Sequence, residues 1–187
     1  GNPAQPERGR GWLTFGLYPS LRCPTIHSPP ETMEASQQEA TRLPPPVIAI
    51  PSSLDEDFRQ RLLGLKNARI VEQANHGYVD VGENTLVHLL DARDLQPGIQ
   101  DRSLVAVLTD MAKRCEYPVL LIAGNIYGKP PVDVSRSRSI AGFITHLELF
   151  TRIRAIQAPD RFHAAMVLQL LAKQAQRGFH SLGLEDL

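Results

Sequence analysis

The sequence has little of what covalent scaffolds and membrane spans require. Only two of its 187 residues are cysteines, Cys23 and Cys115, which excludes a disulfide framework and a zinc site built on CxxC pairs. The longest apolar run, residues 118–123, is far shorter than the roughly 20 residues that cross a bilayer. We therefore expect no membrane partner and a reducing setting, which is the cytoplasm, or the nucleus in a eukaryote.

Net charge is absent as well, since 20 Lys and Arg residues balance 20 Asp and Glu residues. The balance hides a division along the chain: residues 47–116 hold 8 basic and 11 acidic side chains, whereas residues 129–177 hold 8 basic and 3 acidic ones. Arginine outnumbers lysine by 16 to 4, and its planar guanidinium suits bidentate contacts to phosphate or carboxylate. A basic second half can steer an anionic partner, although a solvated, Arg-rich surface gives the same pattern.

Proline separates the beginning of the chain from the rest. Nine of the fifteen prolines lie in residues 1–46, where no apolar periodicity is visible. Such a segment buries too little apolar surface to offset the entropy that is lost on ordering. We expect residues 1–46 to be a disordered, Pro-rich extension and residues 47–187 to be the folded domain.

Strand and helix signals alternate from residue 47 onward. The expected strands are 47–50, 68–73, 77–81, 85–89, 119–122 and 153–156, and the expected helices end at 65, 114, 150 and 176. Ser52 or Ser53 is the expected cap of the first helix and Asp101 that of the second. The third helix is expected to begin at Arg138 and the fourth at Pro159-Asp160. This order predicts an α/β fold, a single domain with a mixed central sheet of about six strands flanked by helices.

Burial follows from the same patterns. The run 119–122 is the most apolar strand, so we expect it at the centre of the sheet. In the last helix Phe162, Met166 and Leu170 recur at steps of four residues, which favours a place for them in the core.

Several short motifs follow one another in a recognisable order. The densest is Tyr-Pro-Val-Leu-Leu-Ile-Ala-Gly at 117–124, with Tyr127-Gly128 after it; the others are 48–54, 76–78, Asp94-Leu95, 99–104, 140–144, 153–156 and 164–172. Together they cover nearly all of residues 47–187. This part of the chain resembles the XPF/Hef/FANCM-type structure-specific endonuclease domain of the excision-repair cross-complementation group four family. The resemblance implies a PD-D/E-x-K, restriction-endonuclease-like fold and a role in DNA repair or processing.

The resemblance fails at the positions that carry catalysis in active members, where acidic residues hold a divalent cation and a lysine orients water. The cation needs hard oxygen ligands. Apolar or neutral residues stand at these positions here: Pro51, Leu54, Gly77, His88, Leu89, Leu90 and Ala123, with Val87 replacing Leu90 if the gap shifts by one. The resemblance therefore implies a catalytically degenerate nuclease domain without a metal cofactor, which binds DNA or serves as a dimerisation module.

Two other functions stay open. Asp80, Glu83, Asp91 and Asp94 lie close to His88 in sequence, so a rearranged Mg²⁺ site would make the chain an active structure-specific endonuclease. Turn carboxylates and a satisfied histidine explain the same residues without chemistry. A protein–protein scaffold that makes no DNA contact is the third function.

Partner contacts have candidates too. Lys129, Arg136 and Arg138 surround the expected start of a helix, where amide N–H groups and guanidinium groups can hold a phosphate of branched or duplex DNA; a solvated loop is the alternative. In relatives the last two helices build a dimer interface. The matching apolar candidates here are Phe143, Leu147, Phe150, Phe162 and Met166, for a homodimer or a heterodimer with a related nuclease subunit, with core packing as the competing explanation.

Overall fold

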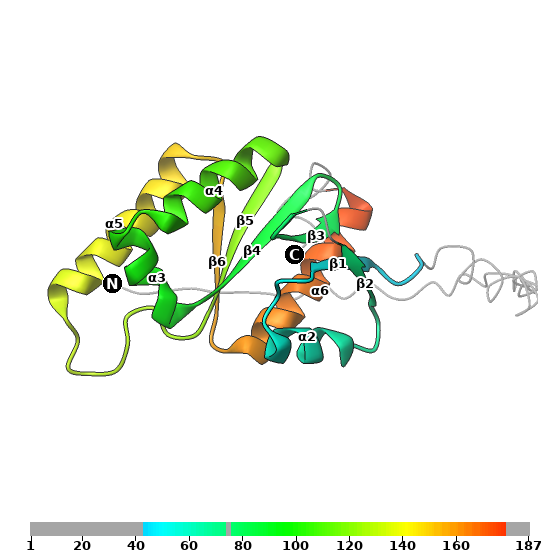
Figure 1. Ribbon diagram of the computed structural model, residues 1–187, viewed down its shortest axis with the longest axis horizontal. Helices are drawn as coiled ribbons and strands as arrows, with labels where there is room; N and C mark the ends of the chain where they lie inside the picture. The colour runs from blue at the N-terminus through cyan, green and yellow to red at the C-terminus, as the bar shows by residue number, and fades with distance from the viewer. Residues whose placement is uncertain (1–42, 74–75, 179–187) are drawn as a thin grey trace, which may run out of the picture. The chain divides into compact units, whose positions relative to one another are not determined.

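The computed structural model describes residues 43–73 and 76–178 (Figure 1). The strands are β1 (Val47–Pro51), β2 (Arg69–Gln73), β3 (Val79–Gly82), β4 (Thr85–Asp91), β5 (Tyr117–Ala123) and β6 (Arg154–Ala158). The helices are α2 (Glu56–Leu63), α3 (Ala92–Gln100), α4 (Ser103–Arg114), α5 (Val134–Phe150) and α6 (Arg161–Arg177). Residues 1–42 of the expected N-terminal extension lie outside the described ranges.

All six strands form one sheet in the order β2-β1-β3-β4-β5-β6. β3 pairs antiparallel with β1 and with β4, whereas β1 with β2, β4 with β5, and β5 with β6 are parallel. The α/β fold with a mixed sheet of six strands is therefore confirmed. Every strand except β3 runs in the same direction, so β1, β4, β5 and β6 end at the same edge of the sheet.

Helices cover both faces of this sheet (Figure 1). Phe58 and Leu62 of α2 and three alanines of α6 pack in one apolar cluster. The helices α3, α4 and α5 pack in a second cluster with Leu120 and Ile122 of β5. Alternate residues of β5 enter opposite clusters, because successive side chains of a strand point to opposite faces. Among the described residues, no helix is long and apolar enough to span a bilayer.

The β3–β4 hairpin has the predicted turn. Glu83 and Asn84 have φ values of 48° and 55°, and Gly82 pairs with Thr85. Positive φ at both central residues is typical of the type I′ turn, whose twist matches that of the strands it joins. The sequence signal and the structure therefore agree on how β3 and β4 are joined.

The position of β5 differs from the prediction. It lies second from the β6 edge rather than at the centre of the sheet. Its apolar sequence has another cause: helices cover it on both faces, and residues Pro118 to Ala123 are all buried. An apolar strand thus indicates burial on two faces and not a central place.

Helix boundaries differ where capping was misassigned. The cap of α2 is Asp55, whose carboxylate accepts the amides of Asp57 and Phe58 at 3.0 and 3.4 Å, and not Ser52 or Ser53. Asp101 does accept the Ser103 amide at 2.9 Å, but Arg102, in a left-handed conformation, holds the cap position of α4. Asp133 caps α5, which begins at Val134, four residues before the predicted start.

Two further expectations about helices were wrong. Helix α3 was not predicted, because Pro97 and Gly98 in its second half are unfavourable in a helix. In α6 the side chains of Phe162, Met166 and Leu170 are 56 %, 42 % and 57 % exposed rather than in the core. The buried residues of α6 are four alanines and one leucine, namely Ala164, Ala165, Leu168, Ala172 and Ala175, and the half-buried Val167 and Leu171 also pack against the cluster on the sheet.

Candidate functional site

A cleft of about 380 Å³ opens where β1 and β4 end, at the start of α2 and α6. Ligand sites of α/β proteins lie outside the carboxyl ends of strands, because the loops and helices that follow the strands converge there. The cleft is lined by Pro51, Ser53, Leu54, Asp55, Phe58, Gly77, Val79, Val87, His88, Leu89, Leu90, Asp91, Arg93, Asp94 and Arg161. It is the candidate functional site of the domain.

The positions at which the family resemblance places catalytic groups come together here. Six of them line the cleft: Pro51, Leu54, Gly77, His88, Leu89 and Leu90. The seventh, Ala123, pairs with Asp91 across β4 and β5 and lines a neighbouring hollow that shares Asp91, Arg93 and Arg161 with the cleft. At none of the seven positions is there a carboxylate or a lysine.

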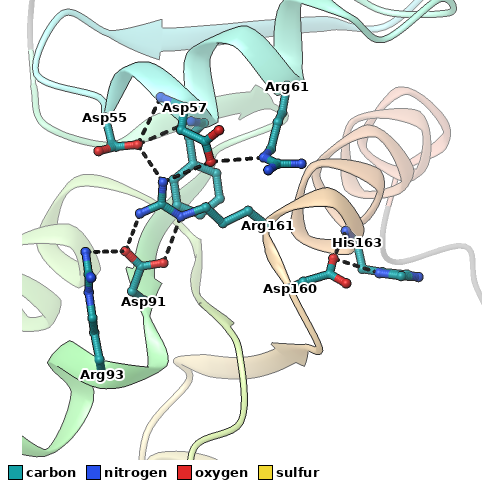
Figure 2. A network of polar contacts seen from close by, with 9 residues as sticks. Asp55, Asp57, Arg61, Asp91, Arg93, Asp160, Arg161 and His163 are labelled. Atoms are coloured by element: carbon teal, nitrogen blue, oxygen red, sulfur yellow. Dashed lines mark hydrogen bonds and ion pairs between the residues drawn. The ribbon is translucent and has the colours of Figure 1, made fainter.

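Carboxylates of Asp55, Asp91 and Asp94 line the cleft from other positions, and an arginine binds the first two together with Asp57. Asp55 caps α2, Asp57 lies in its first turn, and Asp91 ends β4. Arg161, the first residue of α6, bonds Asp91 through Nε and Nη2 at 3.0 and 2.6 Å (Figure 2). Its Nη1 bonds Asp55 at 2.8 Å and Asp57 at 3.0 Å. One guanidinium thus joins α2, β4 and α6.

Aromatic packing and further charges complete this group. The Arg161 guanidinium lies 4.7 Å from the centre of the Phe58 ring, within the range of a cation–π contact. Its hydrogen bonds, to Asp91 first and then to Asp57, raise the pKa of Arg161. Hydrogen bonds from Arg61 and then Arg161 hold the pKa of Asp57 below its usual value. Among residues 43–73 and 76–178, no three His, Cys, Asp or Glu side chains are placed to hold a metal ion together.

His88 lies at the inner wall of the cleft. Its ring makes an edge contact with Tyr78, with 6.2 Å between ring centres. Burial lowers the pKa of His88 from the model-compound value of 6.5, because a charged imidazolium loses its hydration in this place. The ring is therefore neutral at pH 7, and it lines the cleft as a half-buried, uncharged side chain.

We expect acid to destabilise the protein through His88. The unfolded chain takes up a proton near pH 6.5, whereas the folded chain resists it, so stability is lost as the pH falls from 7 toward 5. The His88→Phe variant should lose less stability over that range than the wild type, as measured by urea denaturation at each pH. His163→Phe is the matched control, since His163 lies on the exposed side of α6 next to Asp160. Equal pH dependence in wild type and His88→Phe would contradict this assignment.

The structure divides the residues of the rearranged metal site. Asp91 and Asp94 line the cleft together with His88. Asp80 and Glu83 lie in another hollow, at the hairpin end of β4, with Arg114 and Cys115. The Asp80 carboxylate accepts the Gly82 amide at 2.8 Å, which is a turn contact. The carboxylates of β3 and its turn therefore do not join those of the cleft.

The basic candidates follow β5 at the same edge of the sheet. Lys129 is exposed in the loop after β5, and the Asn125 side chain shapes this loop through bonds to the Gly128 carbonyl at 2.8 Å and from the Tyr127 amide at 3.1 Å. Arg136 and Arg138 belong to the first two turns of α5 and not to a loop before it. Arg138 is exposed, whereas Arg136 is half-buried and its Nε has no hydrogen-bond partner.

The dimer candidates do not share one surface. Leu147 is buried, and Phe143 packs against the same cluster, so core packing explains both. Phe150 is 74 % exposed at the end of α5, and Phe162 and Met166 are exposed on α6. Since α5 and α6 pack on opposite faces of the sheet, a partner that contacts all three would have to reach around the β6 edge.

Of Arg161 and its three partners, only Asp91 was among the predicted site residues, as a member of the rearranged metal site, and not as a partner of an arginine. The acidic run 55–57 carries a local signal, since Asp residues favour helix starts. Nothing local links that run to Arg161, which is more than 100 residues later, or to Asp91, which is 70 residues earlier than Arg161. Only the packing of α2, β4 and α6 brings them together.

Comparison with known proteins identifies the fold. No protein-family model matches the chain, and no curated sequence is similar to it. Among solved structures it is similar to XPF from Aeropyrum pernix, with a TM-score of 0.63 and 19 % identity over 72 % of this chain and 67 % of that one. It is also similar to XPF from Aeropyrum pernix in complex with DNA, with a TM-score of 0.59 and 17 % identity over 75 % of this chain and 69 % of that one. The XPF-like fold inferred from the sequence motifs is confirmed.

Proposed function

We propose that this chain is a nuclease-fold domain that binds DNA without cleaving it and works in DNA repair or processing. The observation that carries the proposal is the composition of the cleft. The positions at which the resemblance places metal ligands hold Pro51, Leu54, Gly77 and other residues without carboxylates, while Arg161 binds Asp55 and Asp91, two of the three carboxylates that line the cleft, and also Asp57. Metal-assisted attack on a phosphodiester needs oxygen ligands that are free to bind the ion.

Two observations support DNA as the partner. One of the solved structures with this fold is a complex with DNA. In the present chain Lys129 and Arg138 are exposed beside the edge of the sheet that carries the cleft, and residues 129–177 have an excess of basic side chains. Contacts of this kind go to phosphates, so we expect binding that is independent of sequence and weakens steeply with salt.

Replacing Lys129 and Arg138 together by alanine tests this interface. We expect DNA affinity to fall about tenfold and the slope of log K against log salt concentration to become less steep by about 2, since each lost phosphate contact contributes about 0.9. The measurement is fluorescence anisotropy with labelled forked and duplex DNA at several salt concentrations. Lys66→Ala/Lys113→Ala is the control with the same number of charges removed, because both lysines are exposed outside this region. Equal affinity of the two double variants would place the DNA elsewhere, and no binding by the wild type would refute the proposal.

A protein–protein scaffold is the second candidate. Phe162, Met166 and Leu170 form an exposed apolar stripe along α6, and exposed stripes of this kind mark contact surfaces. A dimer that uses this stripe is compatible with DNA binding. Light scattering of the wild type and of Met166→Glu distinguishes the dimer from the monomer. Oligomers that Met166→Glu disrupts, in a protein without DNA affinity, would favour the scaffold.

A further inference from the structure

The guanidinium of Arg161 lies among carboxylates in the cleft, as a bound cation would. Its three nitrogen atoms contact four carboxylate oxygens of Asp55, Asp57 and Asp91 at 2.6 to 3.0 Å, and these acids come from two different elements (Figure 2). Bidentate contact with Asp91 and two contacts through Nη1 orient the guanidinium from both sides. Phe58 covers one side of its plane at 4.7 Å.

The guanidinium of Arg161 is the main positive charge that neutralises the carboxylates around it. The three carboxylates carry three negative charges, and two other arginines contact them: Arg61 at 3.0 Å from Asp57 and Arg93 at 3.8 Å from Asp91. The side chains of Arg61 and Arg93 are 40 % and 79 % exposed, whereas that of Arg161 is 23 % exposed. Water screens the outer pairs, so Arg161 supplies most of the positive charge inside the cleft.

We propose that Arg161 is a built-in cation that keeps divalent metal ions out of the cleft. Carboxylate oxygens are the ligands that Mg²⁺ and Mn²⁺ prefer, but here they bind a cation that is covalently part of the chain and cannot diffuse away. The planar guanidinium also keeps Asp91 on one side and Asp55 and Asp57 on the other. Among the described residues, no three His, Cys, Asp or Glu side chains are placed to bind one metal ion. Removing the Arg161 charge should therefore turn the cleft into a divalent cation site. This inference does not depend on whether the protein binds DNA.

Titration of the full chain with Mn²⁺ by calorimetry tests the inference. We expect no saturable binding to the wild type or to Arg161→Lys, which keeps a cation in the cleft. Arg161→Met keeps an aliphatic stem over Phe58 and removes the charge. It should bind one Mn²⁺ per chain at least tenfold more tightly than the wild type, and Mn²⁺ should raise its melting temperature.

Two further variants test whether the gained Mn²⁺ binding depends on Asp91 and on the loss of Arg161 in particular. Arg161→Met/Asp91→Asn should lose the gained Mn²⁺ binding, and Arg93→Met should gain none, because Arg93 is largely exposed. Saturable Mn²⁺ binding by the wild type that Asp91→Asn weakens would overturn the proposal, as would a folded Arg161→Met that binds no more tightly than the wild type. If Arg161→Met does not fold with or without Mn²⁺, Arg161→Gln, which keeps amide donors for Asp91, is titrated instead. No gain in that variant overturns the proposal as well.

Discussion

Alanine in place of Leu121 is expected to lower the free energy of unfolding by about 3 kcal/mol, within the usual range for a fully buried leucine. Leu121 lies in β5, its side chain is completely buried, and it packs in the apolar cluster that α6 covers. The close approach of the α6 alanines leaves little room for neighbours to collapse into the space that the variant opens. Urea denaturation followed by circular dichroism measures the change.

Leu170→Ala is the matched control for this measurement, because it makes the same chemical change at a leucine that is 57 % exposed. We expect it to alter stability by no more than about 0.5 kcal/mol. If the two variants were destabilised equally, β5 would not be covered on the α6 face and the assignment of the exposed and buried sides of α6 would be wrong.

Arg161→Met is expected to lower the free energy of unfolding by about 2 kcal/mol in the absence of metal. The variant leaves the Asp91 carboxylate, whose side chain is only 19 % exposed, without its bidentate partner. The value is below that of a fully buried pair because Asp55 and Asp57, at 55 % and 49 % exposure, can be hydrated when the guanidinium is gone. Urea denaturation at pH 7 and low salt measures the loss.

A control variant and the pH dependence of the effect test this prediction further. Arg93→Met should have an effect near zero, since that side chain is 79 % exposed and lies 3.8 Å from Asp91. The pKa of Asp57 is held below 3.8 in the folded protein by Arg61 and Arg161, so its contribution is present above pH 3.8 and is lost as the pH falls through the lowered value. The difference between wild type and Arg161→Met should therefore shrink below about pH 4. A difference that grows toward acid would contradict the charge assignment.

Most of the sheet was predictable because its signals are local. The runs at β1, β2 and β5 and the Gly-Glu-Asn turn of the β3–β4 hairpin each indicate a strand or a turn without reference to the rest of the chain. The buried face of α6 was not predictable in this way. Periodicity favoured the large side chains Phe162 and Met166, but a helix that packs closely on a sheet buries its small residues, here Ala164, Ala165 and Ala172.

Only some of the residues that form the cleft could be predicted from the sequence. The family resemblance identified Pro51, Leu54, Gly77 and the residues of β4, and the structure brings these positions together around one opening. Asp91 was named only as a candidate metal ligand, and the charged group centred on Arg161 was missed, since Arg161 is 70 to 106 residues from its partners and no spacing rule links them. Sequence motifs report what a family keeps, whereas this ion cluster consists of contacts that only the folded chain creates.

The most direct test of DNA binding without cleavage is a denaturing gel of labelled forked and duplex DNA, incubated with the protein and Mg²⁺ or Mn²⁺ under conditions where anisotropy shows binding. We expect the protein to bind the DNA in a salt-sensitive way and to leave it intact with either metal. Cleavage that depends on the metal and disappears in Asp91→Asn or Asp94→Asn would contradict it, because the cleft would then hold a working metal site despite Arg161.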